Sequence, residues 1–179
     1  MPYPKRGHSE LRKNRIAVPG ARYFMTAVTR DRQTGLDCFP VWAKLLELAS
    51  RDEADVWAMV LMPDHFHALF VLPEQTDPGD VVRALKGPTV PTLRGLQLAW
   101  QKNYFEHRLR AEEETEPYLR YMMANPYRAN LLELDTTWPF WAVTSPHAAW
   151  FVEKYPKRIP EPEWFGLRRP WEPEDEDES

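Results

Sequence analysis

The stretch VWAMVLMPDHFHALFVL, residues 56–72, predicts a β-hairpin at the centre of the fold. Residues 56–61 form one continuous apolar segment, and residues 65–72 form a second one of similar length. The Met-Pro-Asp sequence between them favours a turn, because proline presets φ and aspartate is common at turn positions. Two strands joined by so short a connection pair in antiparallel fashion.

The second strand carries two histidines, His65 and His67, separated by Phe66. Since side chains alternate across a strand, both imidazoles point to one face and Phe66 points to the other, toward the core. Neutral imidazoles bind many divalent metals, so the pair is a candidate metal site that needs further oxygen or nitrogen ligands. The pattern is also compatible with two histidines that share an exposed strand face without binding a metal.

The rest of the chain predicts further strands and helices around the hairpin. The pattern favours a strand at 22–29 and a weaker one at 104–109, and helices at 40–51, 80–86, 115–124 and 127–134. Asp80 is the expected N-cap of the second helix, and Asn125-Pro126 is expected to separate the last two. This order predicts an α+β fold, a ferredoxin-like sandwich with an antiparallel four- to five-stranded sheet and its helices packed on one face.

The helix at 115–124 carries a second set of candidate functional residues. At 100° per residue, Tyr118, Tyr121 and Asn125 fall on one stripe, and a different stripe has the composition of a core face: Leu119, Met122 and Met123. A phenol oxygen can attack phosphorus when a cation polarises the phosphate, and an amide four residues away can join the ligands of that cation. Structural explanations stay open, because tyrosines often pack with an exposed hydroxyl and Asn125 could cap the next helix.

Charge is distributed unevenly along the 179 residues, whose formal net charge is −4. Residues 172–178 hold six acidic and no basic residues, whereas the first 32 residues hold eight basic residues against two acidic ones. Basic segments beside an acidic tail suit a nucleic-acid binder, although charge alone favours the simpler explanation of a solvated surface. The candidate DNA-binding residues are Lys5, Arg6, Arg12, Lys13, Arg15, Arg83, Lys86, Lys102, Arg108 and Arg110.

The length suits one main domain with appendages. We expect a basic arm at 1–20, the main domain at 21–135, an aromatic and proline-rich extension at 136–170, and an acidic tail at 171–179. Cys38 is the only cysteine, which excludes an intrachain disulfide and a thiolate-rich zinc site. No apolar run reaches the ~18 residues of a membrane span and no secretory signal is visible, so a cytoplasmic protein is expected.

Taken together, these segments resemble the single-tyrosine HUH transposases, and most closely their REP-associated tyrosine transposase branch. MPDHFH at 62–67 looks like the histidine–hydrophobic–histidine motif, and YMMANPYRA at 121–129 resembles the catalytic-tyrosine segment. YFMT at 23–26, VVRALK at 81–86 and WQKNYFEHRLR at 100–110 are similar to the other segments of that branch. The resemblance covers roughly residues 12–135, and it is specific as an ordered set rather than motif by motif.

The resemblance implies a DNA-cleaving and DNA-joining enzyme, an endonuclease of DNA transposition. His65, His67 and Asn125 would bind Mg²⁺ or Mn²⁺, and Tyr121 would attack a DNA phosphate to form a 5′-phosphotyrosine link, whereas Tyr118 does not occupy the nucleophile position. The substrate would be single-stranded DNA with hairpins, such as REP palindromes, bound by a monomer or homodimer at the nucleoid. A domesticated relative that binds hairpins without cleavage, a phosphoesterase that uses water and a structural metal site are the alternatives.

Overall fold

The fold is built on one antiparallel sheet, seen in a computed structural model that describes residues 17–51 and 55–172. The sheet has five strands in the order β4-β1-β3-β2-β5. The strands are β1 (Arg22–Thr29), β2 (Asp55–Leu61), β3 (His65–Val71), β4 (Trp100–Arg108) and β5 (Trp141–Val143). The expected hairpin is confirmed as β2 and β3, which pair from Leu61 and Phe66 at the turn outward.

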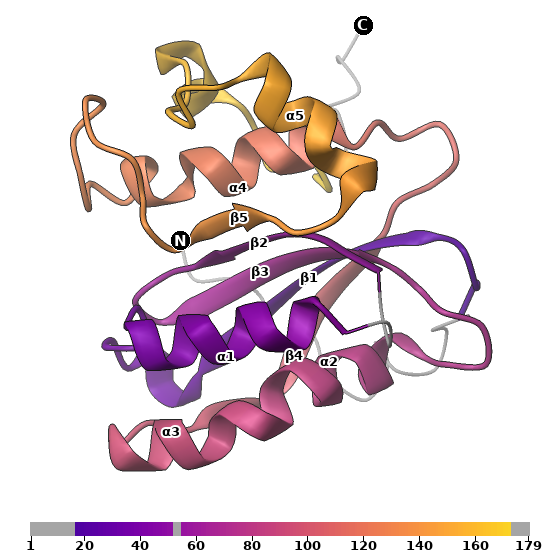
Figure 1. Ribbon diagram of the computed structural model, residues 1–179, viewed down its shortest axis with the longest axis vertical. Helices are drawn as coiled ribbons and strands as arrows, with labels where there is room; N and C mark the ends of the chain where they lie inside the picture. The colour runs from indigo at the N-terminus through magenta and orange to yellow at the C-terminus, as the bar shows by residue number, and fades with distance from the viewer. Residues whose placement is uncertain (1–16, 52–54, 173–179) are drawn as a thin grey trace, which may run out of the picture.

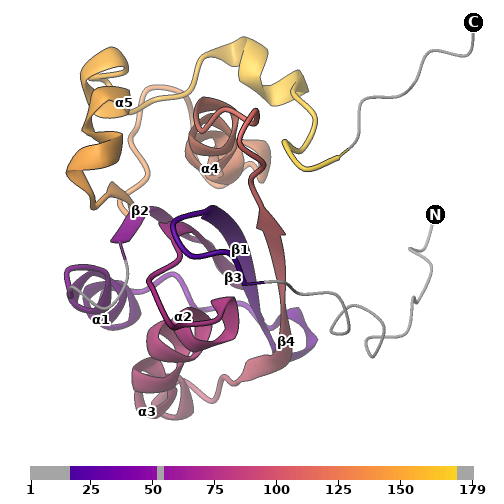
Figure 2. The ribbon, with the colours of Figure 1, turned by 90° about the vertical axis from the view of Figure 1, so that its right-hand side faces the viewer.

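Helices cover both faces of this sheet. On one face lie α1 (Phe39–Ala49), α2 (Pro78–Lys86) and α3 (Val90–Gly95), and on the other lie α4 (Glu116–Arg128) and α5 (Ala149–Lys154) (Figures 1 and 2). Four short 3₁₀ segments complete the described chain: Arg30–Arg32, Gly87–Thr89, Pro146–Ala148 and Pro162–Gly166. The α+β class and the antiparallel sheet are therefore confirmed, but the expectation that the helices pack on one face is wrong.

The composition of the central strands explains why both faces are covered. Met25 and Phe70 are buried on the side of α1 and α2, whereas Phe24 and Leu69 are buried on the side of α4. Since neighbouring residues of a strand point to opposite faces, both faces of β1 and β3 are apolar and each needs a cover. Two separate hydrophobic clusters result, one on each side of the sheet.

Helix α4 continues through Pro126, so the expected break at Asn125-Pro126 is wrong. Pro126 lies in the last turn of the helix, where its missing N–H removes only one hydrogen bond of the helical series. The helical pattern resumes directly, because the Ala129 amide donates to the Asn125 carbonyl at 3.1 Å. Burial of Pro126 and Tyr127 stabilises this last turn.

Two other local expectations are also corrected. The N-cap of α2 is Asp77, whose side chain accepts from the Asp80 amide. Asp80 is the third residue of the helix, and its side chain accepts from the Asp77 amide in return, which completes a capping box. Residues 100–108 form one long edge strand, β4, where only a weak strand at 104–109 was expected. Pairing with β1 extends this strand beyond the segment that the local sequence predicts.

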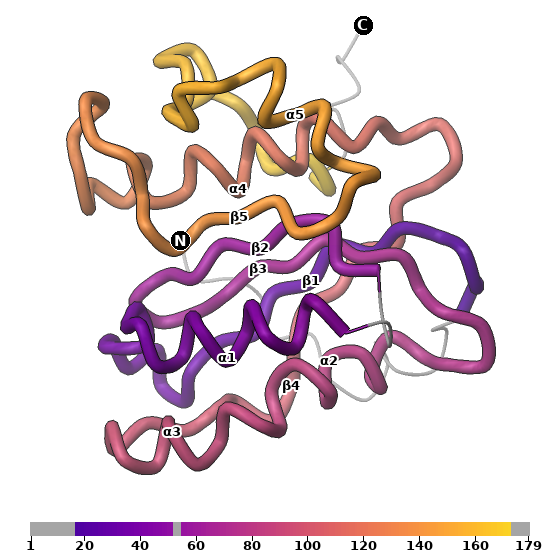
Figure 3. The backbone as a smooth tube through the Cα atoms, in the orientation of Figure 1, coloured from indigo at the N-terminus to yellow at the C-terminus, as the bar shows by residue number. Residues whose placement is uncertain are grey.

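The segment at 136–170 belongs to the same fold as the preceding residues. From α4 the chain runs through a loop to β5, which extends the sheet beside β2, and then into α5 (Figure 3). Trp141, Phe151 and Trp164 lie in the hydrophobic cluster on the α4 side, at 7%, 0% and 2% exposure. Within the described residues, no helix has the length and apolar character that crossing a membrane requires.

Candidate active site

The two histidines lie at the start of β3, on the face covered by α4. Their Nε2 atoms are 3.1 Å apart, and Phe66 points to the opposite cluster, as the strand alternation predicts. Asn125 of α4 approaches the same point, with its Nδ2 atom 3.0 Å from His67 Nε2. Three nitrogen-bearing side chains from two elements that are distant in sequence therefore converge.

The outer nitrogen of each imidazole has a partner of its own. His65 Nδ1 lies 2.5 Å from Asp64 Oδ1, and Arg32 Nη1 lies 2.8 Å from Asp64 Oδ2. The hydrogen bond from His65 lowers the pKa of Asp64 to about 2, so this carboxylate is ionised and accepts the His65 Nδ1 proton. On the other ring, His67 Nδ1 lies 2.8 Å from Thr26 Oγ1 on β1.

Burial decides the charge state of His67. Its side chain is 3% exposed, and desolvation together with the neighbouring His65 lowers its pKa well below the ordinary value. The ring is therefore neutral at pH 7, as a metal ligand must be. With the His65 Nδ1 proton directed to Asp64, one proton or one cation has to lie between the two Nε2 atoms to avoid repulsion of their lone pairs.

These distances fit a divalent cation. Two ligand atoms that are each about 2.1 Å from one cation lie about 3 Å apart when they occupy adjacent octahedral positions. The separations of 3.1 Å between the two histidines and 3.0 Å between His67 and Asn125 match this value. Within residues 17–51 and 55–172, no group of three histidine, cysteine or acidic side chains is arranged to hold a metal ion, so the third protein ligand of this site would be the Asn125 amide. The carboxylate behind His65 is a common arrangement around metal-binding imidazoles.

Tyr121 lies beside this cluster and is half-buried. Its ring centroid is 5.5 Å from that of His67 and 6.1 Å from that of Phe24, with edge-to-face geometry in both pairs. Trp171, near the end of the described chain, places its ring 5.0 Å from Tyr121 and 4.7 Å from Phe24. Aromatic neighbours on several sides fix the orientation of the Tyr121 ring next to the two imidazoles.

Tyr118 is unsuited to the role of nucleophile. It is 1% exposed, and its hydroxyl donates to Glu113 Oε1 at 2.9 Å. Burial and this carboxylate raise the pKa of Tyr118 far above its ordinary value, so the reactive phenolate is disfavoured. The sequence stripe that grouped it with Tyr121 and Asn125 was too wide, because a step of three residues turns by about 300°, which leaves Tyr118 about 60° around the helix axis from Tyr121.

Known proteins resemble this chain in the region that carries the site. A family model described as "Transposase IS200 like" matches residues 21–125, more than half of the chain. The chain belongs to the IS200-like transposase family. The match includes every residue of the candidate site in β1, β3 and α4 as far as Asn125.

One relative of this transposase confirms the resemblance to the REP-associated branch, and one solved structure shares its fold. A REP-associated tyrosine transposase of Escherichia coli (strain K12) is 25% identical over 130 residues, which are 70% of this chain and 78% of that protein. A solved structure of a REP-associated tyrosine transposase bound to a REP hairpin superposes with a TM-score of 0.60 and 23% identity, over 72% of this chain and 79% of that one. Because the sequence identity to that structure is only 23%, the structural likeness shows a shared fold and nothing further.

The candidate DNA-binding residues of the transposase fall into separate places. Lys5, Arg6, Arg12, Lys13 and Arg15 lie outside the described residues. Arg83 and Lys86 are on α2, across the sheet from Tyr121, where Arg83 pairs with Asp80 and Lys86 donates to the Gln101 carbonyl at 2.9 Å. Lys102 is exposed on β4.

Arg108 and Arg110 lie at the far end of β4. They line a cleft of about 550 Å³ together with Arg22 and residues 18–21 and 109–112. The guanidinium of Arg22 is occupied, since it donates to Thr115 Oγ1 and to the Glu113 carbonyl. The exposed Arg108 and Arg110 therefore supply the cationic groups of this cleft that can reach a phosphate.

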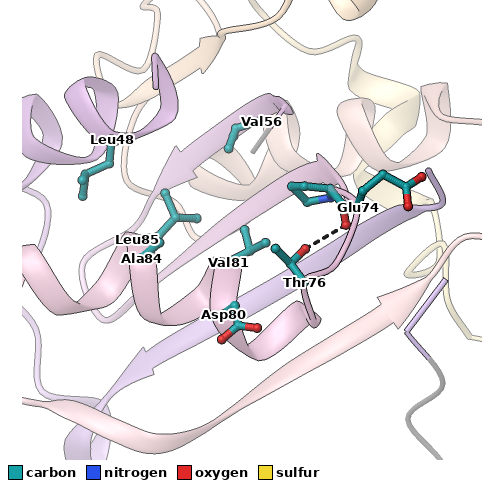
Figure 4. Close-up of a pocket in the computed structure, with 9 residues that line it drawn as sticks. Leu48, Val56, Glu74, Thr76, Asp80, Val81, Ala84 and Leu85 are labelled. Carbon is teal, nitrogen blue, oxygen red and sulfur yellow. Dashed lines mark hydrogen bonds between the residues drawn. The ribbon is translucent and has the colours of Figure 1, made fainter. Parts of the chain in front are cut away.

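A second cavity, of about 400 Å³, is distant from the histidines. Its lining comes from α1, α2, the start of β2 and the loop that follows β3, with Leu48, Val81 and Leu85 on its wall and Glu74 and Asp80 at its rim (Figure 4). An apolar wall with acidic side chains at the rim opposes phosphate binding. None of the candidate site residues lines this cavity.

Several residues of the site have no clear signal in the sequence. Thr26 reaches His67 only because β1 pairs with β3 in the register that opposes these two residues. Trp171 returns to Tyr121 from 50 positions further along the chain. Two other residues do have a signal in the sequence. Asp64 is adjacent to His65, and Arg128 is seven residues after Tyr121, a spacing that puts both on the same face of a helix.

Proposed function

We propose that this transposase cleaves and rejoins single-stranded DNA that forms REP-like hairpins, through a covalent 5′-phosphotyrosine intermediate. The observation that carries the proposal is the position of Tyr121, half-buried and 5.5 Å from the ring of a histidine whose Nε2 atom faces His65 and Asn125. The named relatives, one of which was solved with a REP hairpin, support the choice of DNA substrate.

The proposed ligands of a Mg²⁺ or Mn²⁺ ion are His65, His67 and Asn125. Asp64 and Thr26 hold the two imidazoles with their Nε2 atoms toward one point, which is the orientation that cation binding needs. When bound, the cation supplies Lewis-acid polarisation of the phosphate that Tyr121 attacks. Asn125 would present its amide oxygen to the cation, which corresponds to the flipped assignment of the same planar group.

Tyr121 performs the covalent step in this proposal. Its phenol loses a proton, the oxygen forms a bond to phosphorus, and the bond from phosphorus to the 3′-oxygen breaks to leave a free 3′-hydroxyl after protonation by water. Rejoining reverses these changes with a 3′-hydroxyl as the nucleophile. Because the phosphodiester energy is kept in the phosphotyrosine bond, no nucleotide cofactor is required. The aromatic neighbours of Tyr121 hold its ring in place during both steps.

Incubation with a labelled single-stranded hairpin oligonucleotide and Mn²⁺ or Mg²⁺ tests the proposal. A denaturing gel should show a protein–DNA band that depends on the cation and disappears in Tyr121→Phe. Tyr118→Phe is the matched control, because it removes a buried hydroxyl from the same helix and should leave the band intact. Cleaved DNA without a covalent band would instead indicate a phosphoesterase that uses water, and binding without cleavage would indicate a hairpin-binding protein.

A further inference from the structure

Arg128, at the end of α4, lies beside Tyr121 but has no role in the reaction proposed above. Its guanidinium carbon lies 5.6 Å from the centroid of the Tyr121 ring. The two residues are seven apart on one helix, two turns along the same face, and Asn125 lies between them. The side chain turns back along the helix over the phenol, which is the direction that helical side chains prefer.

The charge of Arg128 is not neutralised by any ion pair among the described residues. The other cations around the site differ in this respect, since Arg32 pairs with Asp64, Arg120 pairs with Glu116 and Arg169 lies 3.4 Å from Glu172. Arg128 is also exposed, so a large anion can reach it. An exposed, unneutralised guanidinium over the ring of a candidate nucleophile indicates a binding site for an anion at that nucleophile.

We propose that Arg128 is a further catalytic residue, which binds the non-bridging oxygens of the phosphate that Tyr121 attacks. This inference rests on the proposed function and specifies which side chain holds the phosphate in addition to the proposed cation. The planar fork of the guanidinium matches two phosphate oxygens, and its charge persists through the reaction. The bonds formed and broken are those already described, and Arg128 itself gains or loses no proton.

This placement gives the phosphate two positive partners, which are the guanidinium of Arg128 and the cation that His65 and His67 would hold. His65 and His67 lie on β3, whereas Arg128 approaches from the last turn of α4, and the Tyr121 ring contacts both His67 and Arg128. Negative charge grows on the non-bridging oxygens as the phenol oxygen bonds to phosphorus, so a fixed cation there stabilises the transition state more than the ground state. Loss of one such preorganised donor slows reactions of this kind by about 10²- to 10³-fold.

The kinetic test compares Arg128→Met, Arg128→Lys and the native protein. Single-turnover formation of the covalent adduct is measured with excess protein, Mn²⁺ and the labelled hairpin oligonucleotide. We expect adduct formation to slow by about 10²-fold in Arg128→Met, by less in Arg128→Lys, and to recover partly when methylguanidinium is added to Arg128→Met. Arg94→Met is the matched control, since Arg94 is an exposed arginine in the last turn of α3 on the other side of the sheet.

A binding measurement separates phosphate contact from a purely structural role. In a Tyr121→Phe background, Arg128→Met should weaken binding of the hairpin oligonucleotide by about tenfold, the value of one charged hydrogen bond. An oligonucleotide with a neutral methylphosphonate at the cleaved position should bind both proteins equally. An equal loss for both oligonucleotides, or an unchanged rate in Arg128→Met while the native protein forms adduct, overturns the assignment of Arg128 alone. Absence of any adduct with the native protein overturns the proposed function and this inference with it.

Discussion

Asp64→Asn tests whether the carboxylate that accepts from His65 Nδ1 helps to prepare the site for a cation, or whether the two histidines suffice alone. The substitution keeps the shape of the side chain and an oxygen that can accept from His65 Nδ1, but it removes the negative charge. The hydrogen bond it weakens is 2.5 Å long and is charge-assisted in the native protein. The pairing of Asp64 with Arg32 is lost as well.

The magnitude follows from that hydrogen bond. Hydrogen bonds to charged groups contribute about 1.5 to 3 kcal/mol, and about 1.4 kcal/mol corresponds to a tenfold change in an equilibrium constant. If the bond mainly orients His65 and makes its Nε2 more basic, Asp64→Asn should weaken Mn²⁺ binding by about 10- to 100-fold. This range agrees with the usual effect of removing a hydrogen-bond partner behind a metal-binding histidine.

The assay is titration with Mn²⁺, followed by the electron paramagnetic resonance signal of the free ion, so no DNA or turnover is needed. Asp55→Asn is the matched control, because Asp55 is a carboxylate on the same sheet that accepts from Trp57 Nε1 instead of a site histidine. The control should bind Mn²⁺ like the native protein. Mn²⁺ affinity in Asp64→Asn within about twofold of the native value would refute the role given to Asp64, whose loss should cost about tenfold or more.

Three further predictions concern stability and the choice of tyrosine. Burial alone would raise the pKa of Glu116, but hydrogen bonds from Lys154, Tyr155 and Arg120 lower it to about 2. The stability that the ionised Glu116 contributes is therefore fully present above about pH 5 and is lost as pH falls toward 2. Urea melts should show Glu116→Gln less stable by about 1 to 3 kcal/mol at pH 7, and this difference should vanish near pH 2. Phe66→Ala should lower the free energy of unfolding by about 3 to 5 kcal/mol in the same melts, since Phe66 is fully buried; a loss below about 1 kcal/mol would contradict its place in the core. Tyr118→Phe should leave the rate of adduct formation in a single-turnover assay unchanged within about threefold, and loss of the adduct would give Tyr118 a role that its burial argues against.

The parts of the site that the sequence predicts depend on local periodicity. The turn at Pro63 and the apolar segments around it suffice to place His65 and His67 on one face, because strand alternation is a property of neighbouring residues. Helical spacing likewise brings Tyr121 and Asn125 onto one face of α4. What joins the strand to the helix is a contact between His67 and Asn125, 58 residues apart, which only the resemblance to a family anticipated.

The parts that local patterns miss are set by packing over long distances. Phe24 and Met25 are neighbours that are both buried, and periodicity alone does not indicate that each faces a different layer of helices. Pro126 looks like a helix breaker until the burial of the last turn of α4 is known. Trp171 contacts Tyr121, but the preceding segment at 136–170 has few periodic signals and many prolines, so its path cannot be predicted from local patterns.

The identity of the nucleophile is the central claim, and peptide mass spectrometry of the trapped adduct tests it most directly. The native protein is incubated with the hairpin oligonucleotide and Mn²⁺, the DNA is trimmed by nuclease, and the peptides are fragmented to locate the added nucleotide. We predict that the nucleotide is attached through phosphate to Tyr121, and that it is absent when the cation is chelated. Attachment at Tyr118 or at any other side chain, or cleavage with no attached nucleotide, would contradict the account.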